Sequence, residues 1–176
     1  MLKRQRFCYA FPMPRIDNKS SKNALTIEQL SLACRHVDEM REEGVTMNLA
    51  IRTLELFADL YAKMHMGGSA TPHHVGQVAL WSVKARSIRR RVPDAKPRDH
   101  FRVEHGTPRR GFALKVLNLY RKDKLSAETM ARLVDRYWKL AVITLEEDER
   151  LNKIARSKTF KTPDERWAAA GIKFQR

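Results

Sequence analysis

Apolar residues recur at helical spacing over two stretches early in the chain and predict two amphipathic helices. The first begins at Thr26, because Thr26 and Gln29 have the spacing of a capping box, and it ends at Gly44. The second covers residues 47–61 and closes before a pair of glycines. The two apolar faces consist of Ile27, Leu30, Cys34 and Val37, and of Met47, Ala50, Ile51, Leu54, Phe57, Ala58 and Tyr61.

Three later helices share one start signal, a threonine followed by a proline, at 71–72, 107–108 and 162–163. The threonine caps the first free amides, and proline at the first helical position loses only an N–H that has no partner there. We expect the first of these helices to continue into the arginine cluster at 89–91. The apolar faces of the first two consist of Val75, Val78, Ala79 and Ser82, and of Phe112, Val116, Leu117 and Tyr120.

Two further helices follow the same kind of pattern. One begins at Ser126, and the next begins at Thr144, which has capping-box spacing to Glu147. Acidic residues fill the first turn of the latter helix, where the helix dipole favours anions. Their inward-facing residues are Met130, Leu133, Val134, Tyr137 and Trp138, and Leu145, Leu151 and Ile154.

These elements predict an all-α fold, a single compact domain of about seven helices with basic N- and C-terminal extensions. We expect a basic arm over 1–24, the helical domain over 25–156, and a basic extension with a short helix over 157–176. Three stretches of alternating or β-branched residues could instead form short strands, namely 7–11, 101–104 and 140–144.

Composition is consistent with an ordinary globular protein. Apolar residues make up 43 % of the 176 residues, and glycine and proline occur only seven times each, which argues against a turn-rich β-sandwich. The aliphatic runs are far shorter than the roughly 20 residues of a membrane span, and no secretory signal is predicted. Cys8 and Cys34 lack metal-ligand spacing, so we expect reduced thiols, a cytoplasmic protein, and no metal or other cofactor.

Charge changes this picture most. Lysine and arginine number 35 against 20 aspartate and glutamate, and from Lys84 to Arg110 there are ten basic residues and three acids. Such a density indicates a polyanionic partner, and the first hypothesis is a protein that grips the phosphate backbone of RNA or DNA with low sequence specificity. The expected contact residues are Arg86, Arg89, Arg90, Arg91, Arg98, Arg102, Arg109 and Arg110, with Trp167 stacking on a base.

The segment 98–105 places two histidines, two arginines and two acids within eight residues, before the predicted helix start at Thr107. A second hypothesis is therefore a metal-independent ribonuclease, since imidazole moves protons near neutral pH and guanidinium holds phosphate. His105 would be the general acid or base and His100 the second proton carrier. The remaining candidate residues are the clamps Arg98 and Arg102, and Glu104.

The same segment is similar to the Arg-polar–His motif of HEPN ribonucleases, with Arg98, Asp99 and His105 at the matching positions. The resemblance covers eight residues and implies a compact all-helical ribonuclease. In that family the motif lies at or within a helix start, whereas here Gly106 and Thr107 place it upstream of one. An HNH-type metal site is not supported, because no histidine follows His105.

Two other interpretations remain open. Glu104 and His105 could pair with Arg109 or Arg110 and merely brace the start of a helix. The protein could also be an interaction subunit or inhibitor that docks on an acidic protein surface. Sequence-specific reading of DNA by a helix-turn-helix is disfavoured, because the second helix of the 126–155 pair begins with acidic residues that would face phosphates. Oligomeric state is not indicated by any pattern.

Overall fold

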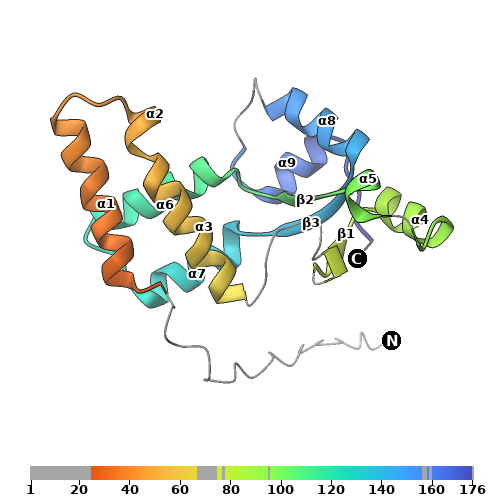
Figure 1. The fold of residues 1–176 in the computed structure, drawn as a ribbon, viewed down its shortest axis with the longest axis horizontal. Helices are drawn as coiled ribbons and strands as arrows, with labels where there is room; N and C mark the ends of the chain where they lie inside the picture. The colour runs from red at the N-terminus through yellow and green to blue at the C-terminus, as the bar shows by residue number, and fades with distance from the viewer. Residues whose placement is uncertain are drawn as a thin grey trace, which may run out of the picture.

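The structure, a computed structural model, describes residues 25–66, 75–76, 78–94, 96–155, 158 and 160–175. Two lobes lie side by side in Figure 1, a bundle of helices on the left and a small sheet with its own helices on the right. The chain enters each lobe twice. Residues 27–66 and 109–137 build the helical lobe, and residues 75–105 and 140–175 build the sheet lobe.

The helical lobe contains α1 (Ile27–Glu42), α2 (Met47–Ala50), α3 (Arg52–Met66), α6 (Arg109–Arg121) and α7 (Ala127–Tyr137). The predicted capping box at the start of α1 is confirmed by hydrogen bonds in both directions between Thr26 and Gln29. The helix predicted over 47–61 is divided at Ile51 into α2 and α3. Apolar faces of all five helices meet in one core whose largest fully buried members are Leu30, Ile51, Leu54, Phe112, Leu117 and Met130.

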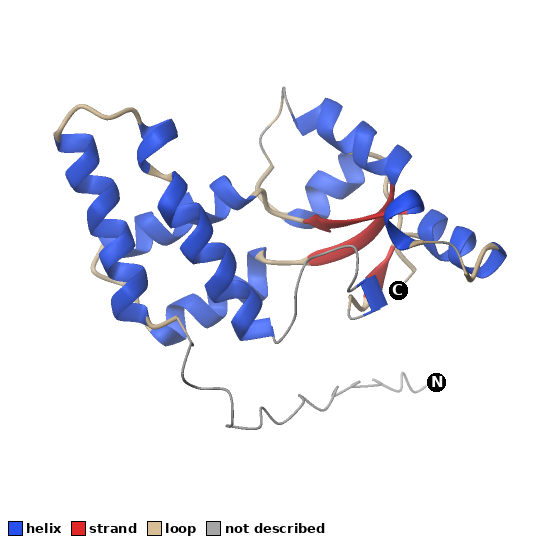
Figure 2. Cartoon of the chain, viewed as in Figure 1, coloured by secondary structure: helices blue, strands red, loops and turns tan. Residues whose placement is uncertain are grey.

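The sheet lobe contains three strands, β1 (Leu80–Trp81), β2 (Phe101–His105) and β3 (Leu140–Thr144), in the order β1-β3-β2 (Figure 2). Strand β1 is parallel to β3, and β2 is antiparallel to β3 with Phe101 opposite Thr144 and His105 opposite Leu140. The accompanying helices are α4 (Val83–Arg91), α5 (Pro97–His100), α8 (Leu145–Ala155) and α9 (Pro163–Ala169).

Each face of the sheet has its own small core, because successive strand residues point to opposite faces. On one face Ala141 and Ile143 pack with Leu151 of α8 and Trp167 of α9. On the other face, residues of all three strands pack with Ala85 of α4 and with the segment before β1; the buried members are Val75, Val78, Ala85, Phe101 and Val142. The lobe therefore depends on two thin apolar layers rather than on one thick core.

The predicted all-α fold holds in its coarser form, since the described residues are mostly helical. The possible strands at 101–104 and 140–144 are both present, and they pair with each other. The prediction of one helix continuing from 75 to the arginine cluster is wrong: Ser82 follows a strand and caps a new helix at Val83. Thr107 does not cap α6, which follows Pro108 without a side-chain cap.

The described part of 157–176 packs against the sheet. Thr162 caps α9 as predicted, and Ala170 and Ile172 are buried in the same core as Trp167. Cys34 is buried on α1, and burial raises the pKa of its thiol to about 12. Within the described ranges, none of the helices has the length and apolar character needed to cross a bilayer. The expected strand at 7–11, Cys8 and the start signal at 71–72 lie outside these ranges.

Candidate nucleic-acid interface

Helix α4 presents the arginines and is fixed at its first residue. The Ser82 hydroxyl accepts a hydrogen bond from the Ala85 amide at 3.0 Å and donates one to the Glu147 carboxylate at 2.6 Å. The same carboxylate oxygen accepts the Thr144 amide at 2.9 Å, which completes the predicted capping box of α8. Glu147 is only 1 % exposed, so a buried network ties the start of α4 to β3 and α8.

Arg86, Arg89 and Arg90 share one side of α4, because residues three and four apart are neighbours on a helix. Together with Trp81 they line a shallow hollow on the surface. Trp81 is held in place, since its indole N–H donates to the Val78 carbonyl at 2.9 Å. Its ring also meets Phe101 edge to face, with 5.4 Å between the ring centroids. The hollow therefore combines a fixed, half-buried aromatic ring with three guanidinium groups.

Nearby acids neutralise Lys84 rather than these arginines. Lys84 lies 3.2 Å from both carboxylate oxygens of Glu146, which also accepts a hydrogen bond from Arg150 at 2.6 Å. Arg91 donates to the backbone carbonyl of Ser87. In the portion of the chain that the structure describes, no carboxylate forms an ion pair with the three arginines of the hollow. Their positive charge is therefore presented to solvent.

The other predicted phosphate contacts do not extend this surface continuously. Arg98 lies 3.6 Å from its neighbour Asp99, and Arg102 donates to the Arg98 carbonyl at 3.1 Å. Arg109 and Arg110 belong to α6 of the helical lobe, and Arg109 lies 3.4 Å from Asp59. The eight arginines thus divide into three groups, on α4, on α5 with β2, and on α6.

His105 lies at the junction of the lobes, in a cluster built from both. Its Nε2 is 3.8 Å from Oδ1 of Asp59 on α3, and its ring meets Trp138 edge to face at 4.8 Å. Asp59 is 3 % exposed and also pairs with Lys63 at 2.8 Å. Burial lowers the pKa of His105 to about 4, with Arg109 and Lys63 adding to the effect of burial and Asp59 opposing it. At neutral pH the imidazole is uncharged.

Glu104 points to the opposite face of β2 from His105 and pairs with Arg166 of α9. Arg166 also donates to the His105 carbonyl at 3.0 Å, so it ties α9 to the end of β2. Burial raises the pKa of Glu104, while the Arg166 guanidinium acts in the opposite direction. The expected brace with Arg109 or Arg110 at the start of α6 is not found among the described contacts. Glu104 instead ties β2 to Arg166 of α9, and His105 lies beside Asp59 of α3.

The residues proposed for ribonuclease chemistry are not brought to one place. His100 ends α5 and His105 ends β2, so at about 3.3 Å per strand residue they lie roughly 16 Å apart along the strand. Arg102 and Glu104 point away from His105 on the other face of β2. The segment that is similar to the HEPN motif therefore forms a short helix and a strand rather than the start of a long helix.

Trp167 cannot stack on a base, contrary to the prediction, because it is 1 % exposed and its ring packs against Phe174. Trp81 takes its place as the accessible tryptophan beside the arginines. Asp59 and Arg166 were missed, because each reaches its partner from a distant part of the sequence. Among the residues that the structure describes, no three His, Cys, Asp or Glu side chains gather as a metal site.

Comparison of the chain with protein-family models, with curated proteins and with solved structures returns no match. Function has to be inferred from the geometry and charge of this surface.

Proposed function

We propose that the protein binds nucleic acid through its phosphate backbone, with the α4 hollow as the principal contact surface. The observation that carries this proposal is the group of three arginines around the Trp81 ring, which have no acidic partner among the described residues. Guanidinium groups bind phosphate oxygens in bidentate fashion, and a fixed aromatic ring stacks on an unpaired base whatever its identity. The surface suits a strand with accessible bases, and it provides no means of reading a particular sequence.

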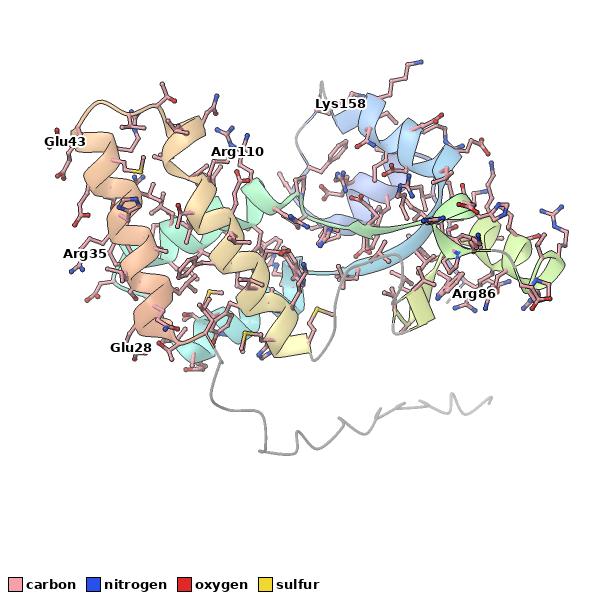
Figure 3. All side chains as sticks on the ribbon, viewed as in Figure 1. Glu28, Arg35, Glu43, Arg86, Arg110 and Lys158 are labelled. Carbon is pink, nitrogen blue, oxygen red and sulfur yellow. The ribbon has the colours of Figure 1, made fainter. Side chains whose placement is uncertain are left out.

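Net charge supports the proposal independently of the hollow. An excess of 15 positive charges raises the local concentration of any polyanion and favours rapid, salt-sensitive association. The arginines of α4 lie at the far end of the sheet lobe from the helical lobe (Figure 3, where Arg86 and Arg35 are labelled at opposite ends). Acidic side chains at the two ends of α1, Glu28 in its first turn and Glu43 just after its last residue, are correspondingly remote from this surface.

The test is the salt dependence of binding to single-stranded RNA and DNA, measured by fluorescence anisotropy. The double variant Arg89→Gln, Arg90→Gln removes two phosphate contacts and should reduce the slope of log Kd against log salt by about 1.4, as expected for single strands. The matched control Arg35→Gln, Arg132→Gln removes the same charge from arginines that pair with Glu39 and Glu128. An equal reduction in both double variants would show that only net charge matters and would refute the assignment to α4.

The same experiment addresses the two alternatives. Shortening of the RNA during the titration, lost in His105→Ala, would favour the ribonuclease hypothesis. Absence of nucleic-acid binding, together with salt-sensitive capture of an acidic protein after nuclease treatment, would favour the interaction-subunit hypothesis. Because the predicted ribonuclease residues are dispersed, backbone binding without cleavage is the expected result.

A further inference from the structure

A second groove lies where the lobes meet, on the side where α6 begins. Its walls come from the first turns of α6 and from the segment that leads into α9. Figure 3 labels one residue on either side, Arg110 of α6 and Lys158 of the segment after α8. The groove is separate from the α4 hollow, with which it shares no lining residue.

The groove is strongly cationic. Arg110, Lys115, Lys158 and Lys161 line it, and no carboxylate is present among the described residues of its lining. Lys115 is partly engaged, since its ammonium lies 4.1 Å from the centroid of the Tyr137 ring, whereas Arg110 and Lys158 are exposed. Charges from two separate segments of the chain therefore converge without neutralisation.

Backbone amides add to this charge. Helix α6 is 13 residues long, begins after Pro108 with no side-chain cap, and has no acid in its first turn. Gly111, which lines the groove, leaves the backbone there uncovered by any side chain of its own. The free amides at the start of a helix favour an anion and can donate hydrogen bonds to phosphate oxygens.

A buried guanidinium provides a separate indication of a ligand. Arg166 lines the groove and is only 6 % exposed. One end of its guanidinium is held by Glu104 and by the His105 carbonyl, but its Nε has no hydrogen-bond partner within the described part of the chain. A buried donor without a partner is costly, and the side chain that carries it belongs to the wall of this groove.

Apolar side chains line the same groove. Phe160 and Leu114 contribute to its walls beside the cations, and Phe160 is half-buried. An aromatic ring next to a concentration of positive charge matches a nucleotide, whose base stacks while its phosphate is held by the cations. A terminal phosphomonoester carries up to two charges, which suits this density better than the single charge of an internal phosphodiester.

The geometry points to a binding site for a nucleotide with a terminal phosphate, supplied either by the end of a nucleic-acid strand or as a free nucleoside monophosphate. This inference rests on the proposed function in so far as the ligand belongs to a strand. It adds to that function a preference for phosphorylated ends, which the α4 hollow alone would not produce.

The test compares oligothymidylates of one length that carry a phosphate at the 5′ end, at the 3′ end, or at neither end. The full-length protein should bind one of the two phosphorylated strands, either the 5′ or the 3′ form, about tenfold more tightly than the strand with hydroxyl groups at both ends. This difference is expected for charge-assisted hydrogen bonds. The double variant Arg110→Gln, Lys158→Gln should lose that difference, whereas Arg35→Gln, Arg132→Gln should keep it. Binding of AMP alone would identify the free nucleotide as sufficient, and AMP that fails to bind would identify the strand end as the source.

Equal affinity of wild type for all three strands, or a preference that survives in the groove variant, would overturn the inference. Failure of the proposed function is distinguishable. The α4 variant Arg89→Gln, Arg90→Gln should weaken binding of every strand to the same extent and retain the preference for the phosphorylated end. Unchanged binding in that variant, with the end preference intact, would refute the α4 assignment and leave the groove as the nucleotide site.

Discussion

The two lobes are stabilised in different ways. The helical lobe has one apolar core, and charged side chains on its surface pair with acids, as in Arg35 with Glu39 and Arg121 with Asp38. The sheet lobe has two thin apolar layers joined by buried polar groups, among them Glu147 and Arg166. Its outer helix α4 carries five basic residues and no acid.

This difference separates stability from binding. The helical lobe is held by one apolar core and by several local ion pairs, and two cations of its α6, Arg110 and Lys115, face the groove between the lobes. In the sheet lobe, buried hydrogen bonds fix α4 and α9 in place, and the arginines at the exposed end of α4 remain available to solvent. Four sets of measurements test this difference between the lobes.

Removal of Trp167 should have the largest effect. Trp167→Ala takes the largest fully buried side chain out of a thin layer and should lower the free energy of unfolding by about 3–5 kcal/mol. Urea denaturation followed by circular dichroism measures the loss. Trp81→Ala, a half-buried tryptophan of the same lobe, is the control and should cost much less. Similar losses in both variants would contradict the assignment of Trp167 to the core.

Separation of Glu104 from Arg166 should cost about 3 kcal/mol, because Glu104→Ala leaves a buried guanidinium without its counter-ion. The double variant Glu104→Leu, Arg166→Met removes both charges and should recover much of that stability, as measured by thermal unfolding. The losses of stability in the single variants Glu104→Leu and Arg166→Met are measured for comparison. If the double variant loses as much stability as these two losses added together, the two side chains act independently and the proposed link between β2 and α9 is wrong.

Acidification should destabilise the lobe junction through His105. Its folded-state pKa of about 4 lies below the ordinary histidine pKa of 6.5, so the unfolded chain binds the proton more readily. The uncharged His105 imidazole therefore makes its full contribution to the free energy of unfolding above pH 6.5. That contribution is lost as the pH falls towards 4, and the total loss is about 3 kcal/mol. The raised pKa values of Glu104 and Asp148 act with the opposite sign.

The difference in unfolding free energy between wild type and His105→Gln isolates this effect, because both proteins retain the two carboxyls. NMR titration of the imidazole gives the pKa directly. A value near 6.5 would mean that His105 is hydrated in solution. Asp59→Asn should lower the pKa further, since the Asp59 charge is the one that favours the protonated imidazole.

The smallest effects should come from two single substitutions, each at the start of a helix, that are compared with each other. Thr26→Ala removes an exposed cap of the helical lobe and should cost about 1 kcal/mol. Ser82→Ala removes a cap and also a donor to the buried Glu147 carboxylate, so its cost should be about 2 kcal/mol. Chemical denaturation measures both. Equal costs would mean that Glu147 gains nothing from the serine hydroxyl.

Local signals in the sequence predicted the helix starts well. The capping boxes at Thr26 and Thr144 depend on residues three positions apart, and both are present. The threonine–proline signal gives the cap at Thr162 but not at Thr107, since α6 follows Pro108 without a side-chain cap. The two-residue strand β1 could not be found in this way, because a strand so short has no alternation to detect. The helical spacing of Val75, Val78, Ala79 and Ser82 placed Ser82 inside a helix instead of at its cap.

The charge of the candidate site could be predicted, and its partners could not. Asp94 is the single acid near the arginines at 89–91 along the chain, and among the described residues it forms no ion pair with Arg89 or Arg90. Burial of a tryptophan depends on tertiary packing: Trp167 sits in a basic segment yet contacts Phe174 and the sheet, while Trp81 is left accessible. The pairing of Asp59 with His105 joins elements 46 positions apart and leaves no local pattern.

The pairing of β2 with β3 across the inserted helices α6 and α7 has a consequence for biosynthesis. The two strands cannot meet until the intervening helices have been made, and α4 is anchored later still, by Glu147 and by the hydrogen bond from the Val83 amide to the Lys173 carbonyl at 2.8 Å. A ribosome-bound chain therefore exposes its arginines before the scaffold that holds them exists. The nascent protein meets the RNA-rich surface of the ribosome with that charge already displayed.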